Sequence, residues 1–413
     1  MSFLFNQSSG CVPRASPVEK KTFRLDCFRF TFQGCIDVVF KNYVLLIAIR
    51  VFRAPETVKG ILSAASYLGM ALTPFALHFF TKIYPLPNNR VIGLLLFIVA
   101  GAVILGLFST HWFMFSLAII LAKILYKQTF PFVTDIYNRN YPKERRGRIL
   151  GILFTILGIA GVFFAYFCGR LLDHSLSNYH WILLATALAA LCSGYIFLRI
   201  PNGHMMTYNR DSFLRSNLSI LFNDRLFTFV LCLWSLTSIA FQMTAPLRME
   251  YLANQRYGFN LSNGDITLIT VTIPMITRIG SAFFWGKFFD TQNLALMKIT
   301  INGCYLLSIP LFFFTDHFLL WIFSAIVLGL GYSGNLTAWQ LWVTKIVPSP
   351  EKLGIYMSLD VAIMGLRDAL SAALGYFLLS RSISLQTVCI MAMLLIVASL
   401  IGFCFLLKNP RLR

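Results

Sequence analysis

The chain has 413 residues, of which 57% are hydrophobic and 12% are charged, about half the charged share of an ordinary soluble domain. This composition excludes a soluble globular protein, and it excludes a disordered one because disorder needs low hydrophobicity and high charge. The net charge of +19 is explained by basic residues that gather at the cytoplasmic ends of transmembrane helices. Nucleic acid is therefore not an expected partner.

Apolar runs long enough to cross a bilayer, about 20 residues each, recur twelve times along the chain. They predict an all-α polytopic membrane protein whose 12 transmembrane helices form two pseudo-symmetric six-helix bundles. The expected spans are about 30–49, 60–83, 91–109, 112–135, 149–172, 181–198, 226–249, 265–285, 298–315, 318–343, 355–379 and 387–407.

Positive charges in the loops predict the orientation. With the N-terminus in the cytoplasm, 23 of the 35 Lys and Arg residues fall on the cytoplasmic side, Lys298 among them, and seven on the other side, Lys59 and Arg248 among them. This bias predicts that both termini are cytoplasmic and that the chain is a multi-pass protein of a plasma or inner membrane. The expected parts are a tail (1–28), a bundle (29–199), a central loop (200–225), a second bundle (226–407) and a tail (408–413).

An internal repeat relates the two halves. A shift of 207 residues aligns Gly158 with Gly365, and it also aligns Glu144 with Glu351 and Gly147 with Gly354. Several matches at one shift, in topologically equivalent places, indicate a duplicated six-helix unit. Parallel repeats of this kind build transporters that rock around a central site.

Twelve spans in two such halves resemble the major facilitator superfamily. The segment 142–148, Pro-Lys-Glu-Arg-Arg-Gly-Arg, looks like that family's basic loop before helix 5, and Gly286-Lys-Phe-Phe-Asp290 resembles the core of its cytoplasmic loop after helix 8. The resemblance implies a gating role for Gly286 and Asp290. This sequence departs from the family pattern in two places, because no Gly-Arg-Arg follows Asp290 and the first-half copy at 75–82 has no Asp.

Charged residues inside spans are functional candidates, since each is costly in a bilayer unless it faces a cavity or has a partner. Asp37 and Lys41 are spaced i,i+4 in the first span, where they could pair with each other or Asp37 could bind a proton or substrate. Lys123 and Lys127 are also i,i+4, in the fourth span. The resemblance implies that helices 1, 4, 7 and 10 line the central cavity, so Lys41, Lys123 and Lys127 are candidate substrate contacts. Pairing of the fourth-span lysines with an acid is the alternative.

Further candidates lie in the second half. Arg278 is expected near the cytoplasmic gate, and the eleventh span holds a candidate charge network of Asp360, Arg367 and Asp368. Polar and indole side chains in the seventh and tenth spans are candidate substrate contacts, although Trp also serves helix packing. They are Trp234, Gln242, Asn335 and Trp339.

The expected function is secondary active transport of a small solute by alternating access. The coupling ion is expected to bind Asp37, and five intramembrane cations against three acids favour an organic anion as substrate. An exporter of amphipathic compounds is the alternative within this class. From other classes, a non-transporting sensor and a membrane-embedded lipid enzyme around Glu250 and Asp265 remain open. The sequence carries no common catalytic, nucleotide or metal motif, so no cofactor or metal is expected. The working form is expected to be a monomer among membrane lipids.

Overall fold

The structure is a computed structural model that describes residues 16–201, 221–259, 261–347 and 353–412. Within these ranges the regular elements are all helices. Eleven helices are long and apolar enough to cross a membrane, and the number is twelve when one bent pair counts as a single span. Most of the expected central loop, residues 202–220, lies outside the described residues.

The N-terminal half holds six spans. In chain order they are α1 (Pro17–Val38) with η2 (Val39–Tyr43) and α2 (Val44–Arg50); α3 (Glu56–Ala71) with α4 (Thr73–His78) and η3 (Phe79–Ile83); α5 (Asn88–Leu107); α6 (Trp112–Gln128) with α7 (Phe130–Asn140); α8 (Lys143–His174); and, after η4 (Leu176–Asn178), α9 (Tyr179–Arg199).

The C-terminal half holds the other six. They are α11 (Arg225–Ala253); then, after η5 (Gln255–Tyr257), α12 (Asn263–Thr267) with η6 (Leu268–Thr272) and α13 (Ile273–Thr291); α14 (Leu294–Phe313); α15 (Phe318–Ile346); α16 (Leu353–Ser380); and α17 (Leu385–Leu406), followed by η8 (Pro410–Leu412).

Prolines mark the breaks inside three spans. Pro74, Pro131 and Pro274 each occupy the second position of a new helical segment, at the starts of α4, α7 and α13. Proline has no N–H to continue the helical ladder, but it is tolerated in the first turn of a helix. The bend before α4 reaches 45°, so the second span has two differently directed parts.

The first helix begins within the segment expected to be a tail. The Ser16 side chain accepts a hydrogen bond from the Glu19 amide and caps α1 at Pro17. The following turns are buried against the N-terminal half, where Asp26 pairs with Arg29 at 2.7 Å and accepts a hydrogen bond from the Tyr141 hydroxyl at 2.6 Å. Residues 17–28 are therefore part of the N-terminal half rather than a separate tail.

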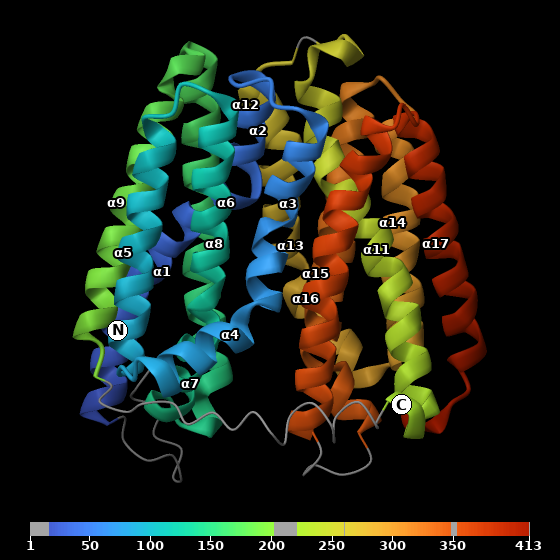
Figure 1. The fold of residues 1–413 in the computed structure, drawn as a ribbon. Coiled ribbons are helices and arrows are strands. Elements are labelled where there is room, and N and C mark those ends of the chain that lie inside the picture. The colour runs from blue at the N-terminus through green and yellow to red at the C-terminus, as the bar shows by residue number, and fades with distance from the viewer. Residues whose placement is uncertain (1–15, 202–220, 260, 348–352, 413) are drawn as a thin grey trace.

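The two halves lie side by side, blue to green and yellow to red in Figure 1. Glycines related by the 207-residue repeat make equivalent contacts between them. A Cβ added to Gly158 on α8 would meet Ile279 on α13, and one added to Gly365 on α16 would meet Ala71 on α3. The fifth span (α8) thus packs against the eighth (α13) as the eleventh (α16) packs against the second (α3). This is the symmetry that a duplicated unit predicts.

Candidate functional site between the two halves

A cluster of cations occupies the interface between the halves. Lys41 from η2 and Lys127 from the last turn of α6 belong to the N-terminal half, and Arg278 from α13 belongs to the C-terminal half. All three lie close enough to Tyr332 of α15 for their charges to act on its hydroxyl. The Arg278 guanidinium carbon is 5.6 Å from the centre of the Tyr332 ring. We call Lys41, Lys127, Arg278 and Tyr332 the cationic cluster.

Asp37 is the carboxylate beside this cluster. Its Oδ1 accepts a hydrogen bond from the Tyr126 hydroxyl at 3.0 Å, and its charge acts on Lys127. The ion pair with Lys41 that the i,i+4 spacing allows is not formed within the described residues. Asp37 is therefore held by the phenol of Tyr126 and stays partly accessible.

Lys123 has a different environment from Lys127, one turn away. Its side chain is 3% exposed, and its Nζ donates a hydrogen bond to the Leu62 carbonyl of α3 at 2.5 Å. Lys123 therefore ties α6 to α3 inside the N-terminal half. Lys127 lies nearer the C-terminal half and has no carboxylate in hydrogen-bond range among the described residues.

A polar chain links the halves through Gln242 of α11. Its side-chain oxygen accepts from the Tyr67 hydroxyl of α3 at 3.0 Å, and its amide nitrogen donates to Asp368 of α16 at 3.3 Å. Asp368 also accepts from Ser238 at 2.7 Å and pairs with Arg367 at 2.8 Å. The predicted residues Gln242, Arg367 and Asp368 thus come together where α3, α11 and α16 meet.

Asp360 is not paired directly with Arg367. It is 2% exposed and accepts hydrogen bonds from the indole N–H groups of Trp339 and Trp342 of α15, at 3.0 and 3.3 Å. Trp339, predicted to contact substrate, thus holds a buried carboxylate and joins α15 to α16.

Lys298 is a buried cation that the loop-charge pattern placed on the cytoplasmic side. It is fully buried, its Nζ donates to the Asn335 side chain at 2.9 Å, and it lies 3.9 Å from the centre of the Trp234 ring. Trp234 and Asn335, both predicted substrate contacts, are therefore engaged with Lys298 inside the C-terminal half. Its position one turn into α14 made it look like a helix-end charge.

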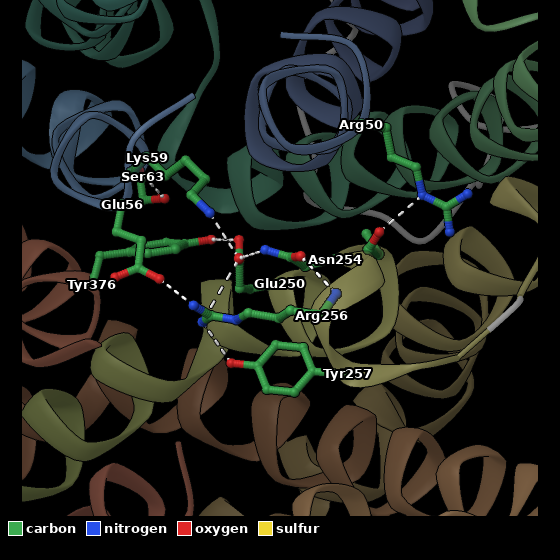
Figure 2. Close-up of polar contacts among 10 residues, drawn as sticks. Arg50, Glu56, Lys59, Ser63, Glu250, Asn254, Arg256, Tyr257 and Tyr376 are labelled. Atoms are coloured by element: carbon green, nitrogen blue, oxygen red, sulfur yellow. Dashed lines mark hydrogen bonds and ion pairs between the residues drawn. The ribbon is translucent and has the colours of Figure 1, made fainter. Parts of the chain in front are cut away.

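The strongest polar contacts between the halves lie at the end of the molecule away from the chain termini, which we call the distal end (Figure 1). Figure 2 shows them: Glu250 of α11 is fully buried, pairs with Lys59 of α3 at 2.7 Å, and accepts from Tyr376 at 3.2 Å and Asn254 at 2.6 Å. Arg256 pairs with Glu56 across the interface beside this group. We call Glu56, Lys59, Glu250, Arg256 and Tyr376 the distal lock.

Two neighbouring contacts reinforce the distal lock. Arg50 donates to the Ala253 and Leu261 carbonyls at 3.0 and 3.1 Å, and Asp173 accepts from the Asn263 and Gly264 amides at 2.5 and 3.0 Å. The charge pattern of the sequence assigned Lys59 to a loop and did not reveal the lock, since nothing in the local pattern pairs residues 191 apart.

Gly286 and Asp290 lie near the terminal end, away from the distal lock. Asp290 is exposed, and a Cβ added to Gly286 would meet open space. Among the described residues, the hydrogen bonds and ion pairs that cross between the halves run from Tyr67–Gln242 to the distal end. The halves are thus fastened at one end, and the predicted gate residues are at the other.

Asp265, grouped with Glu250 in the lipid-enzyme alternative, has a capping role. It forms a reciprocal pair with Ser262 at the start of α12, and Glu250 is committed to the distal lock. Within the described residues, no group of three or more His, Cys, Asp or Glu side chains could hold a metal ion.

The sequence profile of the Major Facilitator Superfamily matches residues 30–349. The chain belongs to the Major Facilitator Superfamily. No curated protein sequence matches it significantly, so the remaining comparisons are with solved structures; the three described next are each 13% identical to this chain and show its fold.

Three superfamily structures illustrate the similarity. A nucleoside transporter, NupG, matches with a TM-score of 0.72 and 13% identity, over 95% of this chain and 100% of that one. A D-xylose-proton symporter matches with a TM-score of 0.66 and 13% identity, over 93% and 97%. A bacterial homolog of the human lysosomal transporter Spinster, inward-facing and occupied, matches with a TM-score of 0.63 and 13% identity, over 96% of each chain. The chain is thus an integral membrane transporter.

Proposed function

We propose that this transporter is a secondary active carrier of a small organic anion, which binds at the cationic cluster between the halves. The observation that carries the proposal is the charge balance there: Lys41, Lys127 and Arg278 surround Tyr332, and Asp37 is the carboxylate that acts on Lys127 among the described residues. Uncompensated cations at an interface inside a membrane attract an anion, because a charge without a partner is costly there.

The cluster is divided between the halves in the way that alternating access requires. Lys41 and Lys127 come from one half, and Arg278 and Tyr332 come from the other. An anion that contacts both sets would bind more tightly to a conformation in which the two sets are close together than to one in which they are apart. Differential binding of this kind shifts the population between conformations.

Asp37 is our proposed coupling residue. It lies on the same helical unit as Lys41 and is linked to the fourth span through Tyr126. A proton or cation on Asp37 would remove the negative charge beside Lys127 and so strengthen the cluster for an anion. We further propose, from the distribution of basic residues, that both termini face the cytoplasm and that the carrier works as a monomer.

Ligand-dependent thermal stability of the detergent-purified protein tests the substrate class. A panel of organic anions and amphipathic cations is applied to the wild type, to Lys127→Gln and to Lys123→Gln. A ligand at 100 times its Kd stabilises by about 2.7 kcal/mol. We expect an anion to stabilise the wild type, Lys127→Gln to weaken its binding about 10- to 100-fold through the lost charged contact, and Lys123→Gln to keep the affinity.

Stabilisation by amphipathic cations alone would contradict the anion proposal and favour an exporter of such compounds. Coupling is tested next in proteoliposomes with the anion that binds. We expect Asp37→Asn to exchange labelled for unlabelled substrate but to lose accumulation driven by an imposed ion gradient. Unchanged accumulation in Asp37→Asn would exclude Asp37 as the coupling residue.

A further inference from the structure

Arg248 is a buried cation that the transport proposal does not use. It lies on α11 in the C-terminal half and is 4% exposed. Its Nη1 donates to Ser324 Oγ at 3.1 Å and its Nη2 to Ser308 Oγ at 2.7 Å. The guanidinium carbon also lies 4.5 Å from the centre of the Phe312 ring.

The partners of Arg248 are all neutral. The two serine hydroxyls direct their own protons to main-chain carbonyls, Ser324 to Ser308 O at 2.7 Å and Ser308 to Ser324 O at 3.3 Å. No carboxylate pairs with Arg248 among the described residues. A guanidinium has five N–H donors, so donors remain free after these two bonds. An unpaired charge buried in a membrane protein costs several kcal/mol.

A small internal cavity adjoins this cation. Its volume is about 10 Å³, and it is lined by Arg248 and Tyr305 together with mostly apolar side chains: Phe241, Thr244, Ala245, Ile309, Leu328 and Ile396. The Tyr305 hydroxyl is buried and has no hydrogen-bond partner among the described residues. The charge neighbours of that hydroxyl are Tyr332 and Cys304 rather than Arg248, so of the two groups it is Arg248, with its free donors, that can donate to an anion beside it.

We propose that this cavity binds a single halide ion, chloride under ordinary conditions. The small volume of the cavity favours a single monatomic ion over carboxylates, phosphates and other organic anions. A halide would neutralise Arg248 without needing the directional geometry of a carboxylate. This site is separate from the cationic cluster, whose members do not line the cavity.

The position of the site gives the halide a structural consequence. Its lining comes from α11, α14, α15 and α17, so a bound ion holds four helices of the C-terminal half together. Arg248 is also two residues from Glu250, the buried acid of the distal lock. A halide therefore stabilises the part of α11 that presents Glu250 to Lys59.

Thermal unfolding of the purified protein in sodium chloride and in sodium gluconate, at equal ionic strength, tests the proposal. We expect a saturable rise in Tm of about 2–4 °C with chloride, and a similar rise with bromide. Arg248→Gln is expected to abolish the halide dependence. Tyr305→Phe, which keeps the ring and removes only the hydroxyl, should keep the halide dependence, because that hydroxyl lies nearer Tyr332 than Arg248. Lys127→Gln, in the cationic cluster, is the control and should keep the full response.

Crystals grown in bromide give an independent readout, since the anomalous signal of bromide locates the ion directly. A peak beside Arg248 is expected. Identical unfolding in chloride and gluconate would overturn the proposal and leave the cavity to a water molecule. A halide response that survives Arg248→Gln but is lost in Lys127→Gln would also overturn it, because the ion would then bind at the cationic cluster.

Discussion

At the scale of single residues, burial and partners separate side chains that look equivalent in the sequence. Lys123 and Lys127 lie one helical turn apart, yet Lys123 donates to a carbonyl inside its own half and Lys127 lies in the cationic cluster. The sequence identified both as intramembrane charges because charge and span position are local properties. It did not separate them, because the direction of each side chain depends on how α6 packs against α3 and the other half.

Glu250 offers the sharpest test at this scale. Glu250→Gln leaves the Lys59 ammonium buried without its counter-charge, and breaking a buried ion pair costs about 3–5 kcal/mol. This cost applies only while the distal end is closed, so we predict a shift of more than about 100-fold towards conformations that are open there. Spin labels at Thr110→Cys and Ser382→Cys, in distal loops of the two halves, should report a longer distance by pulsed electron resonance.

Two further variants show whether the unpaired charge of Lys59 is what opens the distal end in Glu250→Gln. Glu56→Gln removes the acid of the more exposed pair with Arg256, whose side chain is 40% exposed, so the expected loss is below about 1 kcal/mol. Adding Lys59→Met to Glu250→Gln removes the stranded cation and should restore most of the short distance. A double variant as open as Glu250→Gln alone would contradict the ion-pair explanation.

At the scale of elements, the sequence predicted the spans well and their internal breaks less well. Apolar length fixes where a helix crosses the membrane, so each expected span has a counterpart in the structure. The start of α1 at Pro17 was not expected, because the polar residues of its first turns depend on tertiary contacts such as that of Asp26 with Tyr141. The repeat-related contacts of Gly158 and Gly365 follow from packing between spans rather than from any one span.

Close packing of α3 on α16 leads to a second prediction. A Cβ added to Gly60 would lie 3.0 Å from Tyr376 Cβ and 3.3 Å from the Ala373 carbonyl, so the branched side chain of Gly60→Val has no room while the distal end is closed. We expect this variant to fold but to favour the distally open conformation. A Ser63→Cys reporter on α3 should then react with an impermeant thiol reagent at least about 10-fold faster in the Gly60→Val background than without that substitution. The reactivity of the native cysteines is subtracted from both rates.

Gly101→Val is the matched control, because a Cβ at Gly101 on α5 meets nothing within 4 Å. It should leave the reactivity of Ser63→Cys unchanged. Equal reactivity in the Gly60→Val and Gly101→Val backgrounds would mean that α3 and α16 need not separate for the distal end to open.

The start of α11 gives a prediction about pH. Burial opposes ionisation of Asp224, but hydrogen bonds from Arg411, the Phe227 amide and Tyr356 outweigh it and lower the pKa of Asp224 below its usual value. A lowered pKa in the folded state means that this stabilisation is present at neutral pH and is lost as the pH falls through about 4 and below. We predict that the fall in Tm between pH 5 and pH 3 is smaller in Asp224→Asn than in the wild type. An equal fall in both proteins would show that Asp224 does not contribute.

At the scale of the whole molecule, two similar halves are fastened at one end. The sequence predicted the halves, since duplication leaves its trace in the 207-residue shift. It did not predict the distal lock, because Lys59 and Glu250 are 191 residues apart in the sequence and come together only when the halves dock. The cationic cluster and the distal lock therefore belong to the assembled molecule, and we expect turnover to require that the lock breaks in each cycle.

A reversible cross-link at the distal end tests that requirement. A Cβ at Gly60 would lie 3.6 Å from the Ala373 Cα, which suits the short Cα and Cβ separations of a disulfide, so Gly60→Cys with Ala373→Cys should link the halves on oxidation. We predict that oxidation stops transport in proteoliposomes and that dithiothreitol restores it, while the oxidised protein still binds its ligand in detergent. If the distal contact is not broken during the cycle, transport will continue in the oxidised protein.

The control cross-link joins two helices within one half. Gly93 on α5 and Gly194 on α9 approach each other closely, since a Cβ on either would lie 3.2–3.3 Å from the carbonyl of the other. Gly93→Cys with Gly194→Cys should therefore form a disulfide without spanning the interface. Because alternating access moves the halves as units around the central site, this link should leave transport unchanged. Arrest by both links would mean that the N-terminal half must deform internally during the cycle, and rigid-body rocking would then not describe this carrier.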